Sequence, residues 1–147
     1  METVKEGLYI KFIHAYINLY SKGFRRTAKF MYWINRMALS CDIPPTVKVG
    51  KNFQLKHYGL GVVIHPYAVI KDNVTIYQQV TLGSRYRKPS YITIEDGATL
   101  GAGCKIMGGV EPLTIGKNAQ IGANAVVLTS VPAGATAVGV PAKIIHR

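Results

Sequence analysis

The chain has 147 residues, enough for one domain with its own hydrophobic core. Eighteen Lys and Arg stand against seven Asp and Glu, and this net charge of +11 points either to an anionic partner or simply to solubility. No run of about 18 apolar residues, no signal-peptide pattern and no disulfide framework from the two cysteines is present, so we expect a cytoplasmic protein without a transmembrane helix.

Residues 1–40 predict two amphipathic helices that are separated near Ser21–Gly23. The stretches "LYIKFIHAYINLY" and "FRRTAKFMYWINRMAL" combine aromatic and aliphatic residues with interspersed Lys and Arg. One interpretation is that these helices cap the open end of the following domain or pack in an oligomer. The alternative is peripheral contact with the inner membrane face or a lipid-linked substrate, since basic residues beside Trp, Tyr and Phe suit an interface.

From residue 43 onward, aliphatic residues recur every six positions in runs broken three times. The series is Ile43, Val49, Leu55, then Ile64, Ile70, Ile76, Leu82, then Ile94, Leu100, Ile106, and finally Ile115, Ile121, Val127. A Val, Ala or Cys follows four positions later in ten of the thirteen cases: Val47, Ala68, Val74, Val80, Ala98, Cys104, Val110, Ala119, Ala125 and Val131.

A period of six matches neither a helix nor an alternating strand, but it suits a short strand followed by a corner. The aliphatic and the small position both point inward, and three such units close one triangular coil of about 18 residues. Residues 43 to about 142 would supply five or six coils of an all-β solenoid. The break at 84–91, "SRYRKPSY", is either a degenerate unit or an extruded loop.

This repeat resembles that of the hexapeptide-repeat acyltransferases. The resemblance implies that the chain folds as a left-handed parallel β-helix. The expected organisation is a basic helical segment at 1–40 and an acyltransferase domain at 41–147. The segments "CDIPPTVKVG", "HYGLGVVIHPYAVI" and "VPAGATAVGVPAKII" are similar to the serine acetyltransferase branch, and more so to its short sugar O-acetyltransferases of capsule and exopolysaccharide clusters. The resemblance implies acetyl-CoA as acyl donor, no metal and a homotrimer.

The resemblance assigns a general base to His57 and a partner carboxylate to Asp42, fifteen residues earlier. From the residues alone, His57 occupies a corner from which its side chain can leave the solenoid, and Asp42 lies nearly one coil earlier. A carboxylate on one imidazole nitrogen leaves the other nitrogen to accept a proton. The alternative is an ordinary solvated corner histidine.

The resemblance also places coenzyme A along the outside of the helix, in a groove between two subunits. Ala102 and Ala123 match positions that contact coenzyme A, and Lys143 matches a basic residue near its nucleotide end. Gly103 and Arg147 are further candidates. For the small residues the alternative role is close stacking of coils, and for Lys143 it is a solvated charge.

Departures from the family bear on the acceptor. Serine acetyltransferases carry an Asp where this chain has Lys56, and the loop at 84–91 is shorter and lacks a His. A sugar hydroxyl on a glycan precursor therefore suits the basic, tyrosine-bearing loop better than free serine does. The candidates for acceptor binding are Lys56, Tyr58, His65, Arg85, Tyr86 and Arg87.

The sequence thus favours an acetyl-CoA-dependent O-acetyltransferase of polysaccharide biosynthesis, in which His57 deprotonates the attacking hydroxyl. The first alternative is a serine O-acetyltransferase of cysteine biosynthesis. The second is a non-catalytic β-helix that binds membranes or nucleic acid through its charge, although the chain carries no recognised nucleic-acid motif.

Overall fold

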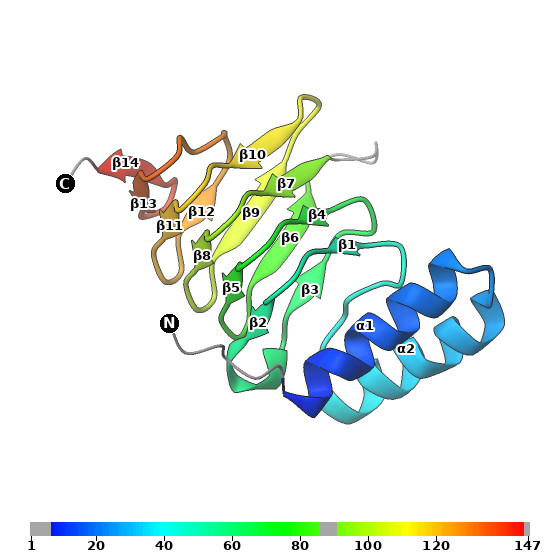
Figure 1. Cartoon of the computed structure of the whole chain (residues 1–147). Coiled ribbons are helices and arrows are strands. Elements are labelled where there is room, and N and C mark those ends of the chain that lie inside the picture. Colours follow the sequence, from blue (N-terminus) through cyan, green and yellow to red (C-terminus); the bar gives the residue numbers. More distant parts are fainter. Residues whose placement is uncertain (1–6, 86–90, 146–147) are drawn as a thin grey trace.

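The structure is a computed structural model that describes residues 7–85 and 91–145. Two antiparallel helices, α1 (Leu8–Ser21) and α2 (Arg25–Leu39), precede a column of short strands (Figure 1). Gly23 separates the helices with a φ of 92°, a value that glycine adopts without a steric penalty. Within the described residues, no helix is long and apolar enough to cross a membrane.

The strands form three sheets, which we call faces 1, 2 and 3 in the order in which the chain visits them. Face 1 holds β1 (Lys48–Val49), β4 (Val69–Ile70), β7 (Ile92–Ile94) and β10 (Leu113–Ile115). Face 2 holds β2 (Gln54–Leu55), β5 (Thr75–Ile76), β8 (Thr99–Leu100), β11 (Gln120–Ile121), β13 (Thr136–Val138) and β14 (Lys143–Ile145). Face 3 holds β3 (Val63–Ile64), β6 (Thr81–Ser84), β9 (Lys105–Gly108) and β12 (Val126–Val127).

All strand pairs are parallel except β13 with β14, which turns back at the C-terminal end. The sequence-based fold is confirmed: the chain is a parallel β-solenoid with two N-terminal helices, consistent with the left-handed β-helix of hexapeptide repeats. The solenoid has about four turns rather than the expected five or six. The physical reason is that the breaks lengthen individual coils, as in the stretch between β2 and β3, instead of adding further ones.

The core follows the six-residue period. On face 2, Ile76 is in register with Leu100, which is in register with Ile121, so identical repeat positions stack coil upon coil. Eleven of the thirteen periodic aliphatic residues are buried, and the other two, Val49 and Leu55, are partly buried against the core. This stacking removes apolar surface from water at the ordinary strand spacing of about 4.8 Å.

Val110 is the small periodic residue for which the expectation is wrong. It is 67% exposed, whereas the other nine small residues of the series are buried. Val110 lies between β9, which ends at Gly108, and β10, which begins at Leu113, so the extra residues of this corner carry it outward.

The helices pack on the first coil at the N-terminal end of the solenoid (Figure 1). Ile10, Ile13 and Tyr16 of α1 belong to the same buried cluster as the strand residues. The Tyr16 hydroxyl donates a 2.8 Å hydrogen bond to the backbone oxygen of Ile43, and Asn35 Nδ2 donates one of 2.9 Å to that of Cys41. The end of the core is therefore covered by the helices, and the first coil is held to them by buried hydrogen bonds.

Candidate active site

His57 lies where the first coil crosses from face 2 to face 3. It belongs to a short 3₁₀ segment, η1 (Lys56–Gly59), and both His57 and Tyr58 have positive φ values, 53° and 55°. Left-handed backbone at two successive residues other than glycine is uncommon, and such conformations gather at functional sites. Both side chains are exposed, and the Tyr58 ring lies 6.0 Å from that of Tyr9 on α1. The imidazole is thus carried outside the solenoid, as a base that meets a substrate must be.

Asp42 lies next to β3, where it forms an isolated parallel bridge with Val63. Its backbone pairs with the segment that follows the His57 corner, through Asp42 N to Val62 O and Ile64 N to Asp42 O, both 2.8 Å. The corner itself packs on the residue before Asp42, because a Cβ atom at Gly59 would lie 3.0 Å from Cys41 Sγ. The fold therefore brings the segments that carry Asp42 and His57 side by side.

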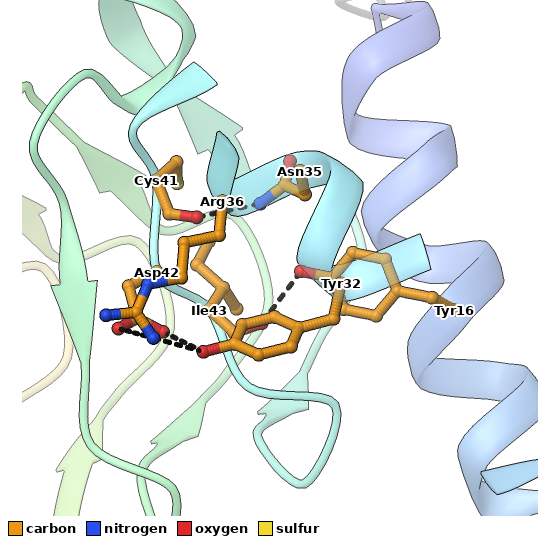
Figure 2. A network of polar contacts seen from close by, with 7 residues as sticks. All are labelled: Tyr16, Tyr32, Asn35, Arg36, Cys41, Asp42 and Ile43. Carbon is orange, nitrogen blue, oxygen red and sulfur yellow. Dashed lines mark hydrogen bonds and ion pairs between the residues drawn. The ribbon is translucent and has the colours of Figure 1, made fainter. Parts of the chain in front are cut away.

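The Asp42 carboxylate is held from α2 and not by His57. Tyr32 donates a 2.6 Å hydrogen bond to Oδ1, and Arg36 Nη1 lies 3.7 Å from Oδ2 (Figure 2). Burial, followed by the contact with Asp42, raises the pKa of Tyr32, so its hydroxyl stays protonated and donates. Among residues 7–85 and 91–145, the His57 imidazole forms no hydrogen bond or ion pair. The pairing of Asp42 with His57 stays a prediction.

Tyr32 and Arg36 were not among the sequence-based site residues. They lie in the helical segment that the sequence assigned to capping or to membrane contact, and no spacing links them to the motif around Asp42. Only the folding of α2 back onto the first coil brings them to the carboxylate (Figure 2).

Removing the Tyr32 hydroxyl tests how firmly Asp42 is anchored. We expect Tyr32→Phe to lower the free energy of unfolding by about 1 to 2 kcal/mol, since a hydrogen bond to a partly exposed charged group is lost. Urea denaturation measures the change. Tyr20→Phe is the matched control, because among the described residues the Tyr20 hydroxyl makes no hydrogen bond. An equal effect in both variants would show that the contact contributes nothing to stability.

In successive coils, the corners between faces 2 and 3 stack on one another and form a continuous edge of the solenoid that begins at His57. Its coils are linked by backbone hydrogen bonds from Gln79 N to Leu60 O (2.8 Å), Gly103 N to Gln78 O (2.9 Å), Asn124 N to Ala102 O (2.8 Å) and Val126 N to Gly139 O (3.0 Å). The candidates Ala102, Gly103 and Ala123 therefore stand in a row with His57 at its lower end. Ala102 is half-buried and Ala123 exposed, so a ligand on this edge meets small side chains and backbone.

Lys143 lies at the far end of the same edge. It begins β14 and is exposed, and the preceding Ala142 donates a 2.8 Å hydrogen bond to Val126 O on face 3. Arg147 lies outside the described residues. The edge thus runs from an imidazole at one end to a cation at the other.

Lys105 is a further residue of this edge that sequence reasoning missed. Its Nζ donates to Gln79 O at 2.8 Å and to Gly103 O at 2.9 Å, so it spans two neighbouring coils. This contact places a positive charge beside the small-residue row. The sequence signal was weak, because a lysine on the outward face of a strand is ordinarily a solvated residue.

The acceptor candidates divide between two edges. Lys56 adjoins His57, and its Nζ donates a 2.7 Å hydrogen bond to Gln54 Oε1. His65 instead lies at the corner between faces 3 and 1, where its Nδ1 accepts a 3.4 Å hydrogen bond from Tyr67 N and burial lowers its pKa. This contact suits a turn residue, and the binding of the acceptor by His65 stays a prediction.

Arg85 lies on the His65 edge as well. Its Nη2 donates a 3.2 Å hydrogen bond to Leu128 O, beside a cavity of about 360 Å³ that is also lined by residues 109–113. Tyr86 and Arg87 lie outside the described residues. Within one chain, Arg85 is thus separated from His57 by the width of face 3.

The two cysteines are free and buried, which bears on the kind of acyl transfer that is available. Burial raises the pKa of the Cys41 thiol to about 11 and that of Cys104 to about 12. A thiol that stays protonated at neutral pH is a poor nucleophile. Among the described residues, no group of three His, Cys, Asp or Glu side chains is placed to hold a metal ion.

Comparison with known proteins agrees with this fold. A family model described as the hexapeptide repeat of succinyl-transferase matches residues 112–138. The serine acetyltransferase of Salmonella typhimurium strain LT2 is 39% identical, over 95% of this chain and 53% of its own length. That of Staphylococcus aureus strain Mu50 is 38% identical, over 99% of this chain and 68% of its own.

Two solved structures extend the likeness to three dimensions. The serine acetyltransferase of Brucella abortus strain S19 in complex with coenzyme A superposes with a TM-score of 0.86 at 33% identity, covering 92% of this chain and 54% of that one. The Neisseria gonorrhoeae enzyme in complex with serine gives 0.85 at 33% identity, covering 94% and 55%. The chain spans about half the length of these structures and of the Salmonella relative.

These likenesses define the class of protein: the chain belongs to the hexapeptide-repeat acyltransferases. Within that class it is of the serine acetyltransferase type.

The same relatives correct the sequence-based preference for a sugar acceptor and for polysaccharide biosynthesis. Homologues that are 33–39% identical over most of the chain are named serine acetyltransferase, which supports the stated alternative instead. The sugar interpretation rested on local differences at Lys56 and at 84–91. Such differences weigh less than a likeness that extends over almost the whole chain.

Proposed function

We propose that this protein transfers the acetyl group of acetyl-CoA to the hydroxyl of L-serine. The observation that carries the proposal is the single edge on which His57 stands at one end of a row of small residues, in a chain similar over nearly its full length to serine acetyltransferases. Relatives of this fold bind coenzyme A and serine, as the complexes above show for those proteins.

In the proposed reaction His57 removes the proton from the serine hydroxyl as its oxygen attacks the thioester carbonyl carbon. The resulting oxyanion needs hydrogen-bond donors, for which backbone N–H groups are suited. Collapse of this intermediate breaks the carbon–sulfur bond. The proton held by the imidazolium then goes to the departing thiolate, so the products are O-acetylserine and coenzyme A.

The row at Ala102 and Ala123 fits an extended donor molecule. Small side chains let a pantetheine arm come close to the backbone, and the cation of Lys143 lies at the end where the phosphates of a nucleotide would be. Lys105 adds a charge beside this path. Asp42 is proposed to orient His57, with its own carboxylate steadied by Tyr32 and Arg36.

The proposed assembly is a homotrimer, as the family resemblance implies. Its support in the structure is indirect: Arg85 and His57 lie on different edges of one chain, so a substrate that meets both would have to lie between two chains. Sedimentation equilibrium on the enzyme used for the assay should return the mass of three chains, and the mass of one chain would contradict the assembly.

The experiment that tests the function measures release of coenzyme A from acetyl-CoA with L-serine, together with mass-spectrometric detection of O-acetylserine. We expect turnover with L-serine that greatly exceeds hydrolysis of acetyl-CoA in water. D-serine is the matched control, because it offers the same hydroxyl in the opposite configuration. The proposal is wrong if L-serine gives no more coenzyme A than the buffer does.

A further inference from the structure

The second helix, α2, shows its bulkiest apolar side chains to solvent. Phe30 is 66% exposed, Trp33 56%, Ile34 46% and Met37 75%. Their spacing of i, i+3, i+4 and i+7 places them on one stripe of the helix. We call these four residues the α2 apolar stripe.

The α2 apolar stripe is not the side of the helix that packs against the rest of the chain. The buried residues of α2 are Ala28 and Asn35, which lie on the opposite side of the helix. Side chains that would suit a core therefore point away from it. A contiguous exposed apolar surface of this kind marks an interaction site rather than an incidental feature.

The charge around the stripe restricts what covers it. Residues 7–40 contain six Lys and Arg and no Asp or Glu: Lys11, Lys22, Arg25, Arg26, Lys29 and Arg36. Arg26 and Lys29 are exposed four residues and one residue before Phe30, and the Arg36 guanidinium, which also lies 3.7 Å from Asp42 Oδ2, is 5.8 Å from the centroid of the Trp33 ring. Cations along one side of the stripe, next to Trp and Phe, match a surface that carries negative charge on the outside and is apolar beneath.

We propose that α2 docks on the surface of an anionic lipid bilayer, with the apolar stripe in the headgroup region and the flanking cations on lipid phosphates. At 15 residues the helix is about 22 Å long, so it lies in the interface and does not span the bilayer of about 30 Å. Packing of two α2 helices against each other is disfavoured, because that contact would bring together side chains of the same charge. This docking is independent of the proposed acetyl transfer.

The test uses the full chain and vesicles of phosphatidylcholine, either alone or with one third phosphatidylglycerol. Trp33 is the only tryptophan, so its fluorescence reports on the stripe directly. We expect co-sedimentation with the anionic vesicles at low salt, a blue shift of the Trp33 emission, and loss of both at high salt. Binding that is equal on neutral vesicles, or absent on both, overturns the proposal.

Variants separate the two parts of the surface. Arg26→Gln with Lys29→Gln should weaken partitioning by about 30-fold, since each cation near an anionic surface contributes about a factor of five. Phe30→Gln with Met37→Gln should weaken it by at least about tenfold and abolish the blue shift. Both pairs lie on the exposed side of the helix, so unfolding midpoints close to that of the parent chain should accompany these losses.

The charge-matched control is Lys71→Gln with Lys117→Gln, two exposed lysines of the solenoid. This pair removes the same charge as the Arg26 and Lys29 pair and should leave partitioning nearly unchanged. An equal loss would show that net charge alone binds the vesicles. A lower sedimentation mass in the Phe30 and Met37 variant would show that a second copy of the chain covers the stripe. Either result overturns the proposal.

Discussion

Replacing His57 by asparagine should lower kcat for acetyl transfer by about 100- to 10,000-fold, because a positioned general base contributes a factor of that order. Asparagine is the sharpest choice at this position. His57 has a φ of 53°, and asparagine tolerates left-handed backbone better than alanine does while lacking a group that accepts a proton near neutral pH. Stopped-time assays of O-acetylserine formation with both L-serine and acetyl-CoA at saturating concentration give kcat directly.

The control for His57→Asn is the same substitution at His65, the other histidine at a corner of the solenoid. His65 lies on a different edge of the solenoid, where its Nδ1 accepts a hydrogen bond from Tyr67 N. We expect His65→Asn to keep kcat within about tenfold of the parent, since it removes no proton acceptor from the His57 edge. If His65→Asn loses activity and His57→Asn keeps it, the assignment of the base is wrong. Urea midpoints for both variants exclude unfolding as the cause.

A large loss of stability is expected when a single methyl group is added at Gly101, between two stacked coils. Gly101 directly follows the short strand β8 on face 2, and a Cβ atom there would lie 2.6 Å from Ile121 O and 2.8 Å from Ala123 N. Both atoms belong to the backbone of the next coil, which cannot move without breaking its own hydrogen bonds. We expect Gly101→Ala to lower the free energy of unfolding by about 3 kcal/mol, as overpacking of a rigid contact does.

Gly7→Ala is the matched control for this prediction. An added methyl group at Gly7 meets no atom within 4 Å, and the φ of this residue is −59°, which alanine adopts readily. The free energies of unfolding of the two variants come from denaturant titrations of the two proteins. Equal stability would show that neighbouring coils yield at Gly101, and that their separation is less rigid than the stack of backbone contacts implies.

The inward positions of the solenoid were predictable because they depend on a local rule. Ile76, Leu100 and Ile121 are related by the six-residue period, and each coil repeats the same short strand and corner, so the core can be identified without knowledge of distant contacts. The rule failed at Val110, where residues between the strands break the repeat. It also overestimated the number of coils, since spacing does not reveal whether extra residues lengthen a corner or begin another coil.

The candidate site was predictable only in part. His57 could be placed at a corner from the repeat, and the row of Ala102 and Ala123 could be placed by resemblance. The partners of Asp42 could not, because Tyr32 and Arg36 reach it only when a helix far from the motif packs on the first coil. The acceptor was misjudged from a few residues beside the site, and relatives matched over the whole chain corrected it.

The stacking of short strands into a column can be predicted from the amino-acid sequence, because the spacing of one buried aliphatic residue in every six is a property of neighbouring residues. The same spacing places a histidine at a corner of the first coil. Other relations emerge only in the folded chain: which corners share an edge, and that Arg85 lies on a different edge from His57. In the same way, only the folded chain shows that α2 contacts the Asp42 carboxylate while its Phe30 and Trp33 side chains face solvent. Those relations join segments that are remote along the chain, and no local periodicity encodes the distance between them.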